Sequence, residues 1–422
     1  MPEQGVVVTK QLAKDQLHYW RDMAKLRPDD VAVAQNYGAC LFTVGESHEA
    51  LKIFAGIEEL DHSTAGIPMN HAMILKDLGR FGESATQCFT AYSIDPDVVH
   101  NGARYTALGW AESLLRNGNW RDAWPIYNDS MFATKEGARD LISIPGEIPY
   151  WRGEPLPLPE HKLLVMGEGG TGDRINYARW LPELDKRGID WRFFIDNSPP
   201  IPGLTSLFQR VPWLAGKFAE TGFTYSHWTT AFGLPAAFDA IPTAIPKYPS
   251  FFLPDPELKK RYEIKANDGL PIYGLIWGAN ELFEGGMKFR SLLESQAMRL
   301  VMCTADKCHW VNCWLGDAHG TNSKLGSPVV NPKFENWEET AALLANMDGI
   351  VSTDNGACWL AQALGLPVSI LLSGNSDWKF LRGTEKCYWS DRARLFRNEG
   401  QGFEQAVDKA IAAIRNGEGV GR

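Results

Sequence analysis

The chain lacks any long apolar run. No stretch of its 422 residues approaches the roughly 18 consecutive apolar residues of a membrane-spanning helix. The apolar run Val6–Val8 near the amino terminus is far shorter than the core of a secretory signal. We therefore expect no membrane span and a cytoplasmic location.

Cysteine and positive charge are also scarce. Seven cysteines, an odd number scattered through a large chain, favour reduced thiols over a disulfide framework. Cys303, Cys308 and Cys313 cluster, but their five-residue spacing matches no usual zinc pattern, so we expect no metal site. The chain has 42 basic and 51 acidic residues, and this negative balance argues against non-specific binding to nucleic acid or anionic membranes. A local basic groove is still compatible with this overall charge.

A regular pattern of glycines marks the first 145 residues. Three glycines each stand five residues before a small residue. The pairs are Gly45 with Ala50, Gly79 with Ser84 and Gly118 with Ala123. The first two glycines are 34 residues apart, the period of the tetratricopeptide repeat, and the third follows after 39, which predicts an insertion. This segment resembles the tetratricopeptide family, and unrelated helical hairpins are the alternative. Such arrays present a concave surface that usually binds a protein.

Strand and helix patterns alternate through the rest of the chain. Expected strands cover 162–167, 191–195, 272–277, 309–315, 328–330, 349–353 and 367–372, and expected helices cover 174–186, 335–346, 357–364 and 402–414. Prolines crowd residues 242–256, which predicts a linker. The fold class is therefore α-helical repeats (1–145) followed by two Rossmann-like, doubly wound α/β domains (146–262 and 263–422) with a cleft between them.

Two strand-to-helix turns carry the candidate chemistry. The turn Asp354-Asn355-Gly356 delivers backbone N–H groups and a helix dipole to a sheet edge, where a diphosphate binds without a metal. The turn that ends in Gly172-Asp173 is not the dinucleotide pattern G-x-G-x-x-G, so nicotinamide chemistry is disfavoured. Asp173 has a second interpretation as a helix N-cap.

Other candidates flank these turns. Lys288 and Arg290 bring positive charge to a loop, either toward a pyrophosphate or simply into solvent. His227 and Trp228 are expected to close a strand at the same edge, on the acceptor side.

Several motifs from Trp151 to about Arg397 together resemble one family. They are Trp151-Arg-Gly-Glu-Pro-Leu, Glu168-Gly-Gly-Thr-Gly-Asp, Gly274-Leu-Ile-Trp-Gly-Ala-Asn, Arg290-Ser-Leu, Val351-Ser-Thr-Asp-Asn-Gly-Ala and Ser376-Asp-Trp-Lys-Phe-Leu. In this order they resemble bacterial proteins that join tetratricopeptide repeats to a glycosyltransferase half of the heptosyltransferase type (glycosyltransferase family 9-like, GT-B). O-linked N-acetylglucosamine transferases are similar more distantly.

The resemblance assigns roles to matching positions. It implies that Asp173 is the catalytic base and that Lys288, with Arg290 next, steadies the donor diphosphate. The donor-binding positions it implies are Gly170, Thr171, Gly172, Trp277, Asn280, Arg290, Trp314 as a floor for the nucleobase, Asp354, Asn355, Gly356 and Ala357. Trp359 stands where the family usually has His, and Asn355 stands where it usually has Thr.

We therefore expect a glycosyltransferase that moves a sugar from a nucleotide-diphosphate sugar to a hydroxyl, inverting and metal-independent, with no cofactor. The alternatives are a non-catalytic tetratricopeptide scaffold with a degenerate nucleotide-sugar-binding half, which the missing His favours, and a nucleotide-sugar epimerase. The acceptor stays open among a protein side chain, a glycan, a lipid-linked sugar and a modified nucleic-acid base.

Overall fold

The chain forms two compact units, Met1–Leu141 and Ile142–Arg422. In the computed structural model of the protein, the described residues are 10–100, 103–131, 148–156, 162–167, 169–195, 201–219, 224–248, 250–279, 290–316, 324–400 and 402–421. Within these ranges no helix is both long and apolar enough to cross a bilayer. The domain boundaries expected at residues 145 and 262 stay predictions.

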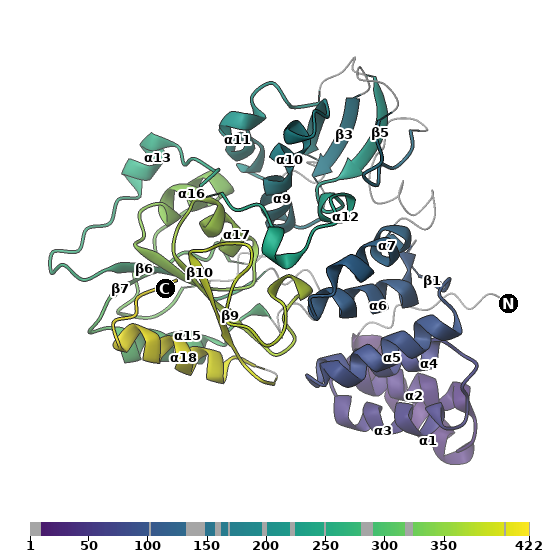
Figure 1. Cartoon of the computed structure of the whole chain (residues 1–422). Coiled ribbons are helices and arrows are strands. Elements are labelled where there is room, and N and C mark those ends of the chain that lie inside the picture. Colours follow the sequence, from purple (N-terminus) through teal and green to yellow (C-terminus); the bar gives the residue numbers. More distant parts are fainter. Residues whose placement is uncertain are drawn as a thin grey trace. The chain divides into compact units, whose positions relative to one another are not determined.

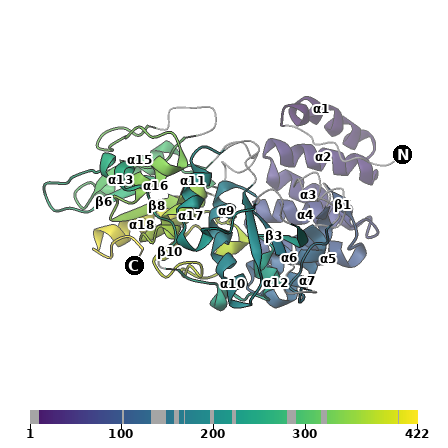
Figure 2. The same cartoon turned by 90° about the horizontal axis from the view of Figure 1, so that it is seen from above.

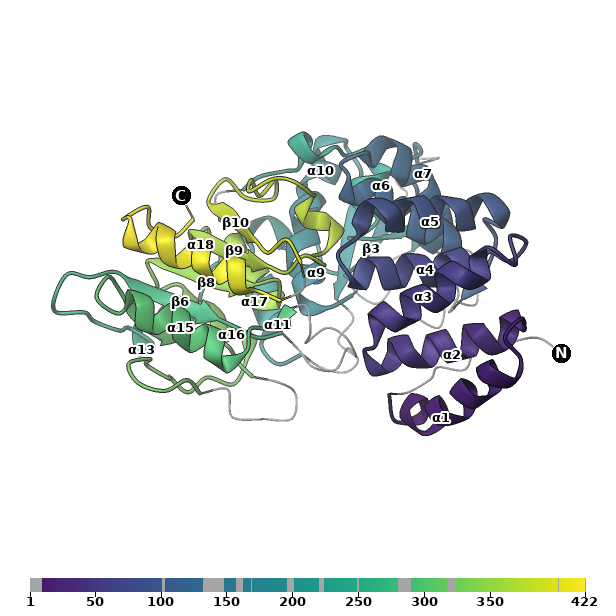
Figure 3. The ribbon, with the colours of Figure 1, turned by 90° about the horizontal axis from the view of Figure 1, so that it is seen from below.

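The first unit is an array of helices in which each packs on the next (Figure 3). Its helices are α1 (Lys10–Leu26), α2 (Val31–Val44), α3 (Ser47–Glu58), α4 (Gly66–Asp77), α5 (Phe81–Ile94), α6 (Tyr105–Arg116) and α7 (Trp120–Met131). The hairpins α2–α3, α4–α5 and α6–α7 turn at Gly45, Gly79 and Gly118, which all have positive φ. Glycine adopts this conformation without strain, so the observed turns account for the repeating glycines.

The small residues of the pattern lie in the core of the array. Ala50 and Ala123 have no exposed surface, and the Ser84 hydroxyl donates to the Ala72 carbonyl at 2.8 Å. The extra residues of the third repeat include a two-stranded ribbon, β1 (Val99–His100) and β2 (Ala103–Arg104). The expected helical repeats with an insertion are therefore present.

The second unit begins with a parallel sheet whose strand order is β4-β3-β5. Its strands are β3 (Lys162–Gly167), β4 (Trp191–Ile195) and β5 (Tyr225–Thr230). Its helical segments are α9 (Thr171–Tyr177), η1 (Ala178–Trp180), α10 (Leu181–Lys186), α11 (Leu204–Gln209), η2 (Pro212–Leu214), α12 (Leu234–Ala237) and η3 (Pro242–Ala244). The expected helix 174–186 is interrupted by the 3₁₀ turn η1, directly before Pro182 in the first turn of α10.

A five-stranded parallel sheet follows, with the order β10-β9-β8-β6-β7. Its strands are β6 (Ile272–Ile276), β7 (His309–Asn312), β8 (Gly349–Thr353), β9 (Val368–Leu372) and β10 (Ala393–Arg397), and its helical segments are α13 (Pro256–Arg261), α15 (Glu294–Thr304), α16 (Trp337–Leu344), α17 (Gly356–Ala363), η4 (Trp378–Phe380) and α18 (Glu404–Arg415). Figure 1 shows α15 with α18 on one face of this sheet and α16 with α17 on the other. Strands β6, β8 and β9 are buried throughout, as expected for a sheet covered on both faces.

Three details of this half differ from expectation. Residues 328–330 form no strand, although Val330 makes a single bridge to Val311. β10 and α15 were not anticipated. Both carry mixed polar and apolar residues, since only one side of each element packs inward.

Candidate functional site

The strand order of the second sheet creates a switch point between β6 and β8. Numbered within this half, the order is 5-4-3-1-2, so the connections after the first and third strands leave on opposite faces. In such sheets the space beyond the carboxyl ends of these two strands is where ligands bind. Here those ends lead directly to Trp277 and to Asp354.

Helix α17 begins at this edge, and the hydrogen-bonding groups of its N-cap side chain, Asn355, are all occupied. The Asn355 side-chain oxygen accepts from the Cys358 amide at 2.9 Å, and its amide group donates to Ser352 Oγ, Thr353 O and Thr353 Oγ1 at 3.1 to 3.2 Å. The Asn355 side chain therefore has no proton left for a phosphate. The backbone N–H groups of Gly356 and Ala357, which lie in the first turn, have no acceptor within the helix.

The start of α9 lies against the start of α17, and Figure 2 shows the two helices side by side. A Cβ atom added to Gly172 would lie 3.0 Å from Gly356 Cα and 2.9 Å from Trp359 Cδ1. Glycine at both positions allows this close approach of two backbones. The two glycine-containing turns singled out from the sequence thus meet in one place.

Asp173 is not the N-cap of α9. Gly170 holds that position without a side-chain hydrogen bond, and Asp173 is the third residue of the helix. Its Oδ1 instead accepts from Lys379 Nζ at 2.9 Å, across 206 positions of sequence. The Asp173 side chain is 30% exposed, whereas the Lys379 side chain is 5% exposed. The carboxylate is therefore accessible to a ligand while its partner is buried.

Lys379 is surrounded by acidic and aromatic groups. Its Nζ lies 3.2 Å from Asp377 Oδ2 and 5.9 Å from the ring centroids of both Tyr177 and Trp359. Burial acts to lower the pKa of Lys379, but Asp173, Asp377 and Asp354 together raise this pKa above its ordinary value. The side chain is therefore a stable cation at the junction of α9, α17 and η4.

A second cation, Arg290, pairs with the Asp354 carboxylate. Arg290 Nη2 lies 3.1 Å from Asp354 Oδ2, and its Nε donates to the Asp354 carbonyl at 2.9 Å. Burial raises the pKa of Asp354, while Arg290 and Lys379 act in the opposite direction. Among the described residues Asp354 Oδ1 has no hydrogen-bond partner, which leaves one buried acceptor available to a ligand.

Aromatic side chains fill the space around these charges. Trp359, at the position of the family's histidine, is 1% exposed and stacks on Phe380 with 5.4 Å between ring centroids. This indole packs directly over Gly172. At the ends of β6 and β7, Trp277 and Trp314 make an edge-to-face contact at 4.6 Å. The role of Trp314 as a floor for the nucleobase stays a prediction.

The remaining predicted residues fall into two groups. Asn280 and Lys288 lie outside the described residues. His227 and Trp228 are described, but they do not reach the site. His227 pairs with Leu163 near the start of β3, three residues and about 10 Å before the sheet edge. Trp228 is 4% exposed and packs on Tyr150. The run His227–Thr230 ends a strand at the sheet edge as expected, but Thr230 is the residue that stands at this edge.

Sequence reasoning missed Lys379, Asp377 and Tyr177. Lys379 lies within a motif that the family resemblance includes, but it was given no role. Asp377 caps η4 by accepting from the Lys379 amide at 3.0 Å, so a local Asp-x-Lys turn was recognisable. The partner Asp173 is too distant in sequence for any local pattern to indicate it. Tyr177 is fully buried, burial raises its pKa well above the ordinary value, and Asp173 raises it further.

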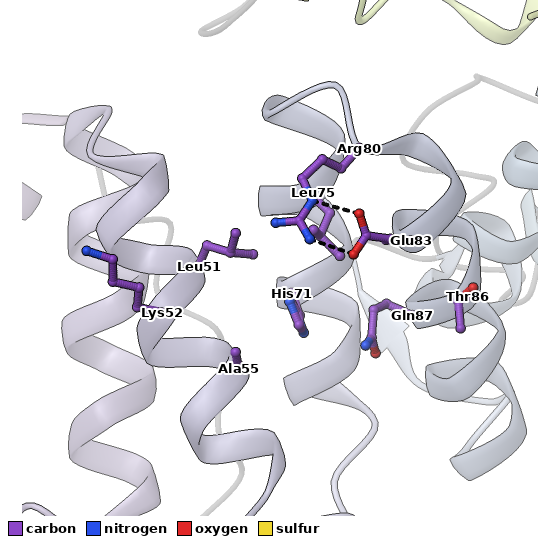
Figure 4. Close-up of a pocket in the computed structure, with 9 residues that line it drawn as sticks. All are labelled: Leu51, Lys52, Ala55, His71, Leu75, Arg80, Glu83, Thr86 and Gln87. Atoms are coloured by element: carbon purple, nitrogen blue, oxygen red, sulfur yellow. Dashed lines mark hydrogen bonds and ion pairs between the residues drawn. The ribbon is translucent and has the colours of Figure 1, made fainter.

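The helical unit contains a separate pocket of about 430 Å³ between α3, α4 and α5 (Figure 4). Its lining residues are Leu51, Lys52, Ala55, His71, Leu75, Arg80, Glu83, Thr86 and Gln87. Arg80 donates to Glu83 from Nε at 2.7 Å, and Lys52 pairs with Glu49 at 2.7 Å. Both cations of the lining are thus neutralised, so the pocket lacks the free positive charge that favours a diphosphate.

Comparison with known proteins gives one sequence relative and several structural neighbours. No family model matches the chain. Protein FlbA of Caulobacter vibrioides is 23% identical over 416 residues, covering 92% of this chain and 68% of FlbA. Because this match covers nearly the whole chain, it includes residues of both the helical unit and the α/β unit.

The structural neighbours cover different shares of the chain. A family 9 glycosyl transferase from Veillonella parvula matches 61% of this chain and 98% of its own, with 11% identity and a TM-score of 0.41. ADP-heptose lipopolysaccharide heptosyltransferase II of E. coli matches 61% of this chain and all of its own, with 16% identity and a TM-score of 0.38. A MamA structure matches 28% of this chain, with 18% identity and a TM-score of 0.24, and the match spans 64% of that MamA chain. The fold is GT-B-like. Because the TM-scores are low, that description rests on the order and pairing of this chain's own two sheets.

Proposed function

We propose that the α/β unit is a glycosyltransferase that moves a sugar from a nucleotide-diphosphate sugar to a hydroxyl acceptor with inversion at the anomeric carbon. The observation that carries this proposal is the approach of Gly172 to Gly356, because it brings a carboxylate beside the first sheet to a helix N-terminus at the edge of the second. A base on one side and an anion site on the other are the two groups that such a transfer requires.

In the proposed reaction a proton is taken up at α9, and negative charge develops at the start of α17. The acceptor oxygen forms a bond to the anomeric carbon while its proton passes to Asp173. The bond from the anomeric carbon to the diphosphate oxygen breaks, and its electron pair stays on the leaving diphosphate. The N–H groups of Gly356 and Ala357 and the helix dipole of α17 stabilise this negative charge. Lys288 is proposed to add a positive charge from its loop, so no divalent metal is needed.

Two residues are proposed to set how the donor binds. Asp354 Oδ1, buried and without a partner among the described residues, is suited to accept a hydrogen bond from a donor hydroxyl. Trp314, in a T-shaped contact with Trp277, is proposed to stack on the nucleobase.

The binding-module alternative has one specific observation in its favour. A large buried indole, Trp359, fills the position where the family carries histidine. In that case the chain binds a nucleotide sugar without turning it over. The partly exposed Asp173 carboxylate, held by Lys379 at the same edge, favours the enzyme.

A donor screen followed by one substitution tests the proposal. Unfolding temperatures are measured with UDP-, ADP-, GDP- and TDP-sugars, because a ligand of the folded state raises apparent stability. Turnover of the stabilising donor is then followed in the wild type and in Asp173→Asn. We expect a loss of about a hundredfold or more in turnover with donor affinity little changed.

Asp391→Asn is the matched control, since Asp391 also pairs with a lysine, Lys247, but is 69% exposed and outside the site. Full turnover in Asp173→Asn removes this residue from the role of base. Donor binding without turnover in the wild type supports the binding-module alternative.

A further inference from the structure

The Lys379 ammonium joins the two halves of the α/β unit at the carboxylate of the proposed base. Asp173 belongs to α9, beside the first sheet, whereas Asp377 and Lys379 belong to η4, beside the second. Lys379 Nζ lies 2.9 Å from Asp173 Oδ1 and 3.2 Å from Asp377 Oδ2. The ammonium therefore contacts one oxygen of the base and one oxygen of a second carboxylate at once.

The lysine is fixed by its surroundings. Its side chain is 5% exposed, and the rings of Tyr177 and Trp359 lie at equal distances of 5.9 Å from Nζ. The Lys379 carbonyl accepts from the Trp389 indole at 2.7 Å, and the Lys379 amide donates to Asp377 at 3.0 Å. A flexible four-carbon chain is thus held in one position by packing and hydrogen bonds.

This arrangement distinguishes the two oxygens of Asp173. Oδ1 is bonded to Lys379, whereas Oδ2 has no hydrogen-bond partner among the described residues and lies toward the glycine turn at Gly169 and Gly170. We propose that Lys379 is a positioning residue of the transferase site, which holds Asp173 through Oδ1 so that Oδ2 takes the acceptor proton. This proposal rests on the proposed function.

Asp377 has a defined part in the same step. As the acceptor oxygen forms its bond to the anomeric carbon, its proton moves to Asp173 Oδ2 and the carboxylate charge is lost. The bond from the anomeric carbon to the diphosphate oxygen breaks, and its electron pair stays on the diphosphate. The ammonium of Lys379 would then lie buried without a counter-ion if Asp173 were its only partner. Because Asp377 Oδ2 is 3.2 Å away, the cation stays paired throughout.

The pairing itself is tested first, by a readout that needs no substrate. Unfolding is measured for the full chain with Asp173→Asn, Lys379→Met and both changes together. We expect the two effects to be non-additive, because the second substitution removes a partner that the first has already lost. Lys247→Met is the control, since Lys247 pairs with Asp391 and lies outside the site. Additive effects of Asp173→Asn and Lys379→Met overturn the proposal whatever the activity.

The role in transfer is tested with the donor that the thermal screen identifies. We expect Lys379→Met to lower kcat about tenfold or more with KM nearly unchanged. An interaction that matters only in the transition state lowers kcat and leaves KM unchanged. Lys379→Arg, which keeps the charge, is expected to retain more activity than Lys379→Met, and added propylamine is expected to restore part of the activity of Lys379→Ala.

The outcomes separate the two proposals. A wild type that turns over none of the four sugar nucleotides overturns the proposed function, and the role of Lys379 falls with it. An active wild type whose kcat is unchanged in Lys379→Met overturns only the role of Lys379. If Lys379→Met does not fold, Lys379→Arg decides: a kcat close to that of the wild type supports positioning by charge, and a loss as large as that of Asp173→Asn contradicts it.

Discussion

Removal of the Arg290 guanidinium is a sharp test of how the site holds its charges. Arg290 makes two contacts with Asp354, a 2.9 Å hydrogen bond to the carbonyl and a 3.1 Å ion pair to Oδ2. The Asp354 side chain is 6% exposed, and its Oδ1 has no partner among the described residues. Arg290→Met therefore removes the cation that is in direct contact with this buried carboxylate.

The loss of unfolding free energy expected for Arg290→Met lies between two limits. Removing one partner of a fully buried ion pair costs about 3–5 kcal/mol, and removing one from an exposed pair costs about 0–1 kcal/mol. Asp354 belongs to the first class, but the Arg290 side chain is 41% exposed, so water already screens the pair. We expect Arg290→Met to lower the free energy of unfolding by about 2 kcal/mol at neutral pH.

The pH dependence of this cost has a definite sign. Burial raises the pKa of Asp354, and Arg290 opposes that rise, so loss of Arg290 raises the pKa further. A carboxyl whose pKa is higher in the folded than in the unfolded state binds more protons when folded, and its contribution to stability falls as pH rises. The deficit of Arg290→Met relative to wild type should therefore be larger at pH 8 than at pH 5.

Urea denaturation at pH 5 and pH 8, followed by tryptophan fluorescence, measures the stability deficit of Arg290→Met. Asp354→Asn removes the charge but keeps the side-chain shape. At pH 8 the double variant Arg290→Met with Asp354→Asn should be more stable than Arg290→Met alone, by about 1–2 kcal/mol. A double variant no more stable than the single one, or a deficit equal at both pH values, refutes the reasoning.

Two further predictions concern residues beside these charges. Gly172→Ala should weaken nucleoside-diphosphate binding about tenfold by calorimetry, because its Cβ would meet Gly356 Cα at 3.0 Å and Trp359 Cδ1 at 2.9 Å. Gly170→Ala, whose nearest contact would be an ordinary 3.7 Å, is the control and should change binding by less than about threefold; equal effects would contradict the close approach. Tyr177→Phe should leave stability unchanged or raise it by up to about 1 kcal/mol in urea denaturation, because the hydroxyl is buried without a partner among the described residues. A loss above that size would show that the hydroxyl is bonded.

The helical repeats and the alternation of strands and helices were predictable because they depend on local pattern. Gly45, Gly79 and Gly118 each occupy a left-handed turn, and the apolar runs of β6 and β8 became fully buried parallel strands. The fold class inferred from these patterns is confirmed by the two sheets. Residues of mixed polarity, such as those of β10, gave no such signal.

The site was only partly predictable because its central contact is not local. The turns at Asp173 and Asp354 were found from glycines and from family resemblance, and the structure brings them together. The ion pair from Lys379 to Asp173 depends on how two sheets face each other, which no spacing in the sequence records. His227 was misplaced for a related reason, since the register of β5 against β3 decides which residue reaches the edge.

The central claim is that the first turn of α17 holds a diphosphate opposite Asp173. A crystal structure of the full chain with the nucleoside diphosphate of the stabilising donor tests it most directly. We expect a phosphate oxygen within hydrogen-bond distance of the N–H groups of Gly356 and Ala357, on the side of α17 that faces α9. A nucleotide bound elsewhere, with these two amides facing only water, would contradict it.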